Sequence, residues 1–317
     1  MSFFGDINSP LGIITFICAL VLIFLNGFTD APNAIATTVA TDALSMNKAC
    51  VLCALCNLIG LGIMSLLNLR VAEAIYSLAS LGDRAQGALF ASLLAVITFT
   101  IFAWLISMPS SESHALMSAL VGASLALGTS VSLTPLFKIV IYMLLSCIGS
   151  ALGSLLTAKL LKNTLLPYRR LQILSCAVMS FSHGAQDGQK LLGVLLLLAP
   201  SAKSRPLAPT VLVCVVLFLG TLLGGGKITK MLGRGISTLN EKSAFIADLG
   251  AGVCLLVCSL LGVPVSTSNV KACAIATSAY CDGRGVNIRA LVKIAYVALA
   301  TIPACAVLSY LVTKLIF

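Results

Sequence analysis

The sequence has little charge. Of its 317 residues only 9% are charged, as 10 acidic and 20 basic side chains, while 59% are hydrophobic. A soluble domain carries about 25% charged residues, and the mean hydropathy of +1.08 is typical of a chain that crosses a membrane many times. No long polar stretch interrupts the apolar sequence. We therefore expect one multi-pass domain in the cell (plasma) membrane, in contact with membrane lipid.

We also expect no nucleic-acid-binding face, no signal peptide and no metal site. The lysines and arginines lie in short connections, which argues against nucleic acid as a partner. Residues 1–10 lack the basic region that begins a signal peptide, so we expect a retained first span. The 12 cysteines include Cys50, Cys53 and Cys56, but this run is apolar and has no neighbouring acids or histidines. We interpret these cysteines as packing residues and expect no cofactor.

Long apolar runs fill most of the chain and predict an all-α integral membrane fold with roughly 10–12 membrane segments. We expect these segments at residues 11–28 (resumed at 34–43), 49–67, 85–108, 109–128, 135–161, 173–199, 208–223, 245–261, 264–279 and 288–317. Residues 70–84 and 227–242 are more polar and predict short connecting helices. Residues 109–128 are rich in small and hydroxyl side chains, which favours a re-entrant or tightly packed half-helix.

Two of the apolar runs carry an aspartate near their middle. Asp30 lies in LNGFTDAPNAIATT and Asp187 in SHGAQDGQKLLGV. A charge inside hydrocarbon costs roughly 2.5–3.5 kcal/mol on insertion scales, so its default interpretation is an ion or substrate site. Glycine, amides and hydroxyls precede each aspartate and helix-forming residues follow it. We therefore predict a broken helix at both positions, with the break of the second run at residues 183–190.

The spacing of these features indicates an internal repeat. Asp30 and Asp187 are 157 positions apart, and Pro109 and Pro264, which begin PSSESH and PVSTSN, are 155 apart. We predict a first repeat at residues 1–162, a basic cytoplasmic linker at 163–170 and a second repeat at 171–317. The connector at 70–84 has no net charge and the one at 227–242 has +3. Under the positive-inside rule they lie on opposite sides of the membrane, so the repeats are inverted.

The repeated segments carry groups suited to an anion. The free N–H groups of a half-helix N-terminus attract anions, and serines and threonines follow both prolines. Lys190 adds a full positive charge, and asparagines add amide donors. The predicted anion ligands are Asn33, Ser111, Ser113, Lys190, Ser266, Thr267, Ser268 and Asn269.

The acids suit a coupling cation. Asp30 and Asp187 would repel an anion unless a cation lies between them or they are protonated, which is the physical basis of symport. Thr29, Gln186 and unwound carbonyls could complete the oxygen shell of Na⁺. A structural alternative pairs Asp187 with Lys190 on one helix face. Further polar residues are interpreted as packing or supporting groups (His114, His183) or as anchors near the segment ends (Asp42, Asp248, Lys271).

At these residues the chain resembles the inorganic phosphate transporter (PiT) family, as a divergent bacterial-type member. That family has two GANDVANA-like motifs, each followed by a PVSTTH-like motif. The corresponding stretches are GFTDAPNA (27–34), PSSESH (109–114), GAQDGQKL (184–191) and PVSTSN (264–269). The resemblance implies a homodimeric, inverted-repeat transporter, not an enzyme, that moves phosphate with Na⁺ or H⁺ by alternating access. Its anion ligands would be the set given above, without Asn269, and its cations would lie near Asp30 and Asp187.

Three of the departures from the family motifs fall on the predicted site. Thr29 and Gln186 replace the asparagine before each aspartate, and Glu112 replaces a threonine. Our hypothesis is that Glu112 carries a co-transported proton or completes a cation site. Sulfate, another oxyanion or a metal–phosphate complex remains an alternative substrate. An alternative of another class, a membrane-embedded hydrolase using Ser113, His114 and Asp30, is disfavoured because no nucleophile-elbow pattern is present.

Overall fold

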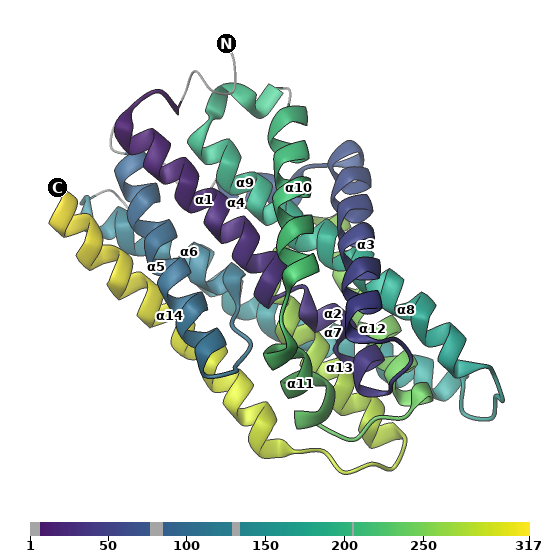
Figure 1. Cartoon of the computed structure of the whole chain (residues 1–317). Coiled ribbons are helices and arrows are strands. Elements are labelled where there is room, and N and C mark those ends of the chain that lie inside the picture. The colour runs from purple at the N-terminus through teal and green to yellow at the C-terminus, as the bar shows by residue number, and fades with distance from the viewer. Residues whose placement is uncertain (1–6, 77–84, 129–133, 205) are drawn as a thin grey trace.

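The computed structural model describes residues 7–76, 85–128, 134–204 and 206–317, and every regular element in them is helical (Figure 1). Within these residues, six helices are long and apolar enough to cross a membrane, or seven if a pair bent by 69° counts as one span. This confirms the all-α integral membrane fold. Part of the connecting helix expected at 70–84 lies outside the described residues.

The helices follow the same order in both halves. The first half contains α1 (Pro10–Thr29), α2 (Pro32–Ala40), α3 (Met46–Leu67), α4 (Arg70–Tyr76), α5 (Ala85–Leu105), α6 (Glu112–Ala126) and α7 (Thr134–Leu160). The second half contains α8 (Tyr168–His183), the π-helical turn η3 (Gly184–Gly188), α9 (Gln189–Leu198), η4 (Pro200–Ser204), α10 (Leu207–Leu223), α11 (Gly226–Gly235), α12 (Glu241–Leu261), α13 (Thr267–Cys281) and α14 (Ile288–Ile316). Apart from the short η3 and η4, each helix of one half has a counterpart in the other.

Helices α6 and α13 begin and end alike. The hydroxyls of Ser111 and Ser266 are the N-caps, and each accepts a hydrogen bond, over 3.4 Å, from the backbone N–H three residues later. Such a cap satisfies one of the free N–H groups of a helix start. Both helices are followed by a glycine with a φ of +69°, Gly128 and Gly283, a conformation that glycine adopts most readily. The sequence therefore builds the same half-length helix twice.

The two aspartates interrupt their helices to different extents. Asp30 and Ala31 form a turn between α1 and α2, and Pro32 begins α2 where no backbone N–H is required. The break predicted at 183–190 does not form. The chain remains helical there and only widens to a π turn. Gln189 stands at the position equivalent to Pro32 and keeps its N–H, so the helix continues through Asp187.

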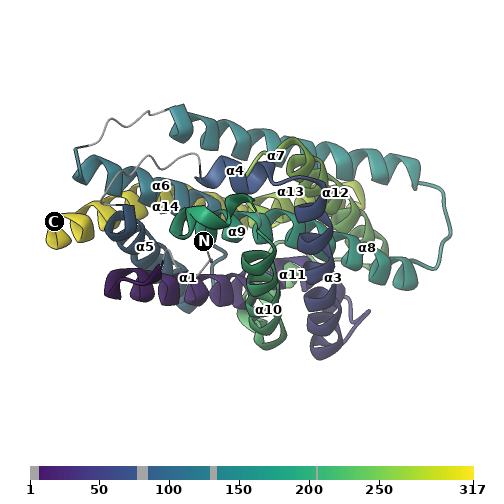
Figure 2. The same cartoon turned by 90° about the horizontal axis from the view of Figure 1, so that it is seen from above.

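The buried side chains form two cores, and each core contains helices from both halves of the chain. The first core consists mainly of α1, α4, α5 and α6 together with α9 and α10 of the second half. The second core consists mainly of α8, α11, α12 and α13 together with α2 and α3 of the first half. The chain thus passes between cores at Asp30–Ala31 and at η3, and it passes back between α3 and α4 and between α10 and α11. In both views α1 and α8 approach the centre from opposite ends of the molecule (Figure 1; Figure 2).

Helices α7 and α14 pack on the outside of these cores. Helix α7 contacts α12 and α13, and α14 contacts α5 and α6. Both helices carry rows of exposed apolar side chains, Ile141, Leu145, Leu152 and Leu156 on α7 and Val292, Leu299, Val307 and Leu311 on α14. Contiguous apolar surface of this length fits a multi-pass protein of the plasma membrane, because soluble proteins rarely expose so large an apolar surface to water.

Candidate functional site

One small cavity brings most of the predicted site together. It is lined by Asp30, Ser111, Glu112, Ser113, Asp187, Lys190, Ser266 and Thr267. These residues come from the turn after α1, from η3 and the first turn of α9, and from the capped starts of α6 and α13. All eight are buried. The four segments predicted to meet do meet, and their side chains fill the space between them.

Lys190 and Asp187 form an ion pair at the centre of this cavity. The Lys190 ammonium contacts Asp187 Oδ1 and also donates to the carbonyl oxygen of Val265 over 2.6 Å. The Thr267 hydroxyl donates to Asp187 Oδ2 over 3.2 Å, and the Ser113 hydroxyl donates to the same Val265 carbonyl over 3.0 Å. Residues of both halves are therefore held against the start of α13.

Asn33 lies beside the cavity and links α2 to α13. Its Nδ2 donates to the hydroxyl of Ser268 over 2.7 Å, and that hydroxyl donates to the Ser110 carbonyl over 3.2 Å. Asn33 Oδ1 is buried and has no hydrogen-bond partner among the described residues. An unpaired buried acceptor costs about 1–3 kcal/mol, so this oxygen is suited to accept a ligand.

Glu112 is held by a residue that the sequence analysis missed. Asn26 Nδ2 donates to Glu112 Oε2 over 2.7 Å, whereas Glu112 Oε1 and Asn26 Oδ1 are buried without a partner in the described part of the chain. Asn26 is one helical turn before Asp30, on the same face of α1. An amide in an otherwise apolar run was the sequence signal that could have identified it.

His183 supports Asp187 from the other side. Its Nε2 is 3.2 Å from Asp187 Oδ2, and its Nδ1 is 3.2 Å from Asn57 Oδ1. Asn57 in turn donates to the Thr221 hydroxyl over 3.3 Å. This chain of contacts orients the imidazole toward the carboxylate, which agrees with interpreting His183 as a supporting residue. Asn57 and Thr221 were not singled out from the sequence.

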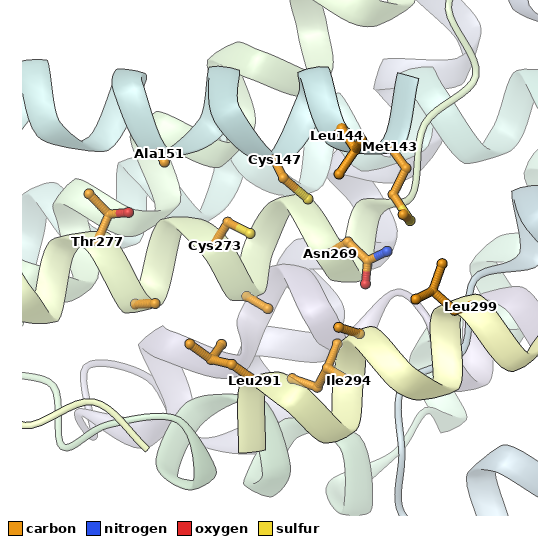
Figure 3. Close-up of a pocket in the computed structure, with 13 residues that line it drawn as sticks. Met143, Leu144, Cys147, Ala151, Asn269, Cys273, Thr277, Leu291, Ile294 and Leu299 are labelled. Carbon is orange, nitrogen blue, oxygen red and sulfur yellow. The ribbon is translucent and has the colours of Figure 1, made fainter. Parts of the chain in front are cut away.

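Five predicted site residues do not line the cavity: Asn33 and Ser268 lie beside it, and Thr29, Gln186 and Asn269 make their contacts elsewhere. The Thr29 hydroxyl donates back to the Leu25 carbonyl over 2.9 Å, and Gln186 is engaged by the Val263 carbonyl and by the Ser259 hydroxyl. Asn269 lines a different cavity of about 440 Å³ between α7, α13 and α14 (Figure 3). Apolar side chains and the thiols of Cys147 and Cys273 form most of that lining, so it does not suit an oxyanion.

Asp248 and Lys271 were interpreted as anchors near segment ends, and this was wrong. Both side chains are fully buried, and they form an ion pair between α12 and α13. The sequence places them 23 positions apart on different helices, so helical spacing within one segment could not reveal the contact.

With this geometry established, comparison with known proteins places the chain. The family model described as "Phosphate transporter family" matches residues 26–168 and 163–309. The chain belongs to this phosphate transporter family. The first matched segment contains Asp30 and Glu112, and the second contains Asp187 and Thr267.

Similar proteins agree with this assignment. A "Probable low-affinity inorganic phosphate transporter" of Bacillus subtilis is 31% identical over 333 residues, covering 98% of this chain and 100% of the relative. A protein of Rhizobium meliloti with the same description is 34% identical over 272 residues, covering 79% of this chain and 80% of the relative. A solved structure described as "The sodium-dependent phosphate transporter" superposes with a TM-score of 0.86 at 19% identity, covering 97% of this chain and 99% of that one.

Family membership makes this protein a transporter rather than an enzyme. The local geometry agrees, because the Ser113 hydroxyl donates to a backbone carbonyl and the Nδ1 of His114 has no partner in the described residues. The two residues do not form the serine–histidine hydrogen bond that a hydrolase requires.

Proposed function

We propose that this transporter carries inorganic phosphate across the plasma membrane in symport with Na⁺ or H⁺, by alternating access. The observation that carries the proposal is the mixed charge of the central cavity. Lys190 and the capped N-termini of α6 and α13 supply positive potential beside three carboxylates, those of Asp30, Glu112 and Asp187. Such a site suits an anion that binds together with cations.

The charge balance gives the cations their role. With all three acids ionised and Lys190 protonated, the cavity carries a net charge of −2 and repels phosphate. Two positive charges taken up from solution would neutralise it. The unpaired oxygens of Asn33 and Glu112 lie at the site and are the type of ligand that Na⁺ prefers. The sodium-dependent structural relative supports Na⁺ as the coupling ion.

Binding requires the Lys190–Asp187 pair to open. In this structure the ammonium is committed to Asp187 and to the Val265 carbonyl, and the side chains occupy the space that phosphate would need. A cation bound at Asp187 would replace the ammonium there and free Lys190 to contact the phosphate. Cation binding and phosphate binding then favour each other, which is what coupling means in free-energy terms.

Each core contains helices from both halves of the chain, and this arrangement supports alternating access. The aspartates lie where the chain passes from one core to the other, so a rocking of one core on the other would act at the site itself. We assign residues 1–162 and 171–317 as inverted repeats joined by a cytoplasmic linker at 163–170, an assignment supported by the matching caps of α6 and α13. We further propose a lipid-surrounded homodimer as the working assembly.

Uptake by the purified protein in liposomes tests this function. Labelled phosphate should accumulate when an inward gradient of Na⁺ or of H⁺ is imposed, and the gradient that drives accumulation identifies the coupling ion. Asp30→Asn should abolish the accumulation, because it removes a carboxylate from the site. Competition by sulfate and arsenate measures the selectivity. Uptake that only equilibrates under both gradients would refute symport, and stronger competition by sulfate than by phosphate would refute phosphate as the substrate.

A further inference from the structure

A second buried polar cluster lies one helical turn from the central site. The Lys271 ammonium contacts Asp248 and lies 3.3 Å from the Thr37 hydroxyl and 3.5 Å from the Ala34 carbonyl oxygen. Thr37 donates to Asp248 Oδ1 over 2.5 Å, and two further hydroxyls, those of Thr38 and Ser175, lie 3.4 Å from Asp248 Oδ2. The cluster therefore joins α2, α8, α12 and α13, and all its members are buried.

The fold does not need a polar cluster at this place. The repeat spacing that relates Asp30 to Asp187 and Pro109 to Pro264 identifies the equivalent positions in the other core. They are Leu93 for Asp248, Leu116 for Lys271 and Val194 for Thr37. All three are buried apolar residues of the first core. Because replacing a buried ion pair by apolar side chains is often neutral or stabilising, packing alone does not account for the charged version.

The partners of the ammonium are those of a small cation. A carboxylate, a hydroxyl and a backbone carbonyl are oxygen ligands of the kind that bind Na⁺ at interrupted membrane helices, and here they converge on one nitrogen. We propose that Lys271 occupies a monovalent-cation site and serves there as a built-in cation. The protein then has a positive charge at this place in every conformation, without taking an ion from solution.

The position of the Lys271 ammonium allows it to join α2 and α13 beside the central cavity. Lys271 follows Ser268 by one turn of α13, and Thr37 follows Asn33 by one turn of α2. The ammonium therefore holds together the same two helices whose first turns make the Asn33–Ser268 hydrogen bond beside the central cavity. The inference does not depend on which ion drives transport, since it concerns a separate site.

Shortening the lysine should convert the built-in cation into a binding site for a free one. We would purify the wild type and Lys271→Ala and measure bound ²²Na⁺ per chain at constant ionic strength, with choline replacing Na⁺. Lys271→Ala should bind one more Na⁺ per chain than the wild type. Its thermal unfolding midpoint should also rise more steeply with Na⁺ concentration.

Two control variants separate a cation site from a mere cavity. Leu116→Ala removes a side chain at the equivalent apolar place and should bind no additional Na⁺. Asp248→Asn/Lys271→Ala leaves the cavity but removes the carboxylate, and it should lose the additional ion. Equal Na⁺ binding by folded Lys271→Ala and the wild type would overturn the proposal.

The proposal remains testable if Lys271→Ala folds poorly. Its yield would be compared in NaCl, KCl and methylammonium chloride with that of Asp248→Asn/Lys271→Met, which has no unpaired charge. Recovery of folded Lys271→Ala by any of these cations supports the built-in cation. Failure in all three, with normal yield of the double variant, shows that no free cation replaces the ammonium and overturns the proposal.

Discussion

Asn26 on α1 donates a hydrogen bond to Glu112 at the start of α6, over 2.7 Å from Nδ2 to Oε2. The amide holds one carboxylate oxygen and leaves the other buried without a partner in the described residues. Glu112 lines the cavity that also contains Asp30 and Asp187. A carboxylate held in this way is suited to take up a positive charge, as a proton or as a ligand of Na⁺.

Removing the charge of Glu112 should change the coupling ratio. We expect Glu112→Gln to move one positive charge fewer per phosphate, because the glutamine neither binds a proton nor needs a cation. The ratio is obtained from charge movement and labelled phosphate uptake on the same proteoliposomes. Asn26→Leu is the matched control, since it keeps the carboxylate and should lower the rate without changing the ratio. An unchanged ratio in Glu112→Gln would remove Glu112 from the mechanism.

Lys190 should matter both for phosphate binding and for the stability of the fold. Lys190→Met removes a charged hydrogen-bond donor, which contributes about 1.5–3 kcal/mol, so the affinity for phosphate should fall by about tenfold to a hundredfold. The same change leaves Asp187 without its ion-pair partner, and breaking a buried pair costs about 3–5 kcal/mol of stability. Equilibrium binding of labelled phosphate and thermal unfolding measure the two effects separately.

The double variant Asp187→Asn/Lys190→Met distinguishes these contributions. It removes both charges and should recover much of the lost stability, but it should not recover phosphate binding. A double variant that binds phosphate as well as the wild type would show that Lys190 serves only to neutralise Asp187.

The hydrogen bond between Asn33 and Ser268 should couple the two residues energetically. Contacting residues show interaction energies of about 0.5–3 kcal/mol in double-mutant cycles, so the stability losses of Asn33→Ala and Ser268→Ala should not add. Unfolding of the two single variants and the double variant gives the coupling. Asn33→Ala with Ser146→Ala is the control, because the hydroxyl that Ser146→Ala removes donates to the Met143 carbonyl of its own helix, α7, so the losses should be additive. Additivity in both pairs would contradict an energetic coupling of α2 and α13 through the Asn33–Ser268 hydrogen bond.

Local patterns predicted the elements that meet at the site. The proline and hydroxyl clusters fixed the starts of α6 and α13, where Ser111 and Ser266 are the caps, and Asp30 marked the break between α1 and α2. These predictions succeeded because a cap and a charge in an apolar run depend on a few neighbouring residues. The repeat boundaries at 162–163 and 170–171 stay predictions.

The remaining parts depended on tertiary contacts or on helix phase. Asn57 and His183 meet across 126 positions, which no local pattern specifies. Asn269 lies two positions after Thr267, and residues two apart on a helix point about 200° apart, so Asn269 faces away from the cavity that Thr267 lines. The π turn at Asp187 reflects Gln189 in place of a proline, a difference that the comparison of the two repeats could have used.

Close packing between α3 and the π turn gives a final prediction. A Cβ atom added at Gly184 would lie 2.2 Å from the backbone oxygen of Asn57, so Gly184→Ala must push η3 away from α3. Overpacking of this kind costs about 1–3 kcal/mol. Because Asn57 also orients His183 toward Asp187, uptake of phosphate should fall together with the unfolding midpoint.

The matched control lies on α3 itself. A Cβ at Gly62 would meet no atom within 4 Å, and alanine is favoured over glycine in a helix by up to about 1 kcal/mol. Gly62→Ala should therefore leave the unfolding midpoint unchanged or raise it, and it should leave uptake unchanged. Equal losses of unfolding midpoint and uptake in Gly62→Ala and Gly184→Ala would mean that any methyl group added at α3 or its neighbour has this effect. The close approach at Asn57 would then not be what positions Asp187.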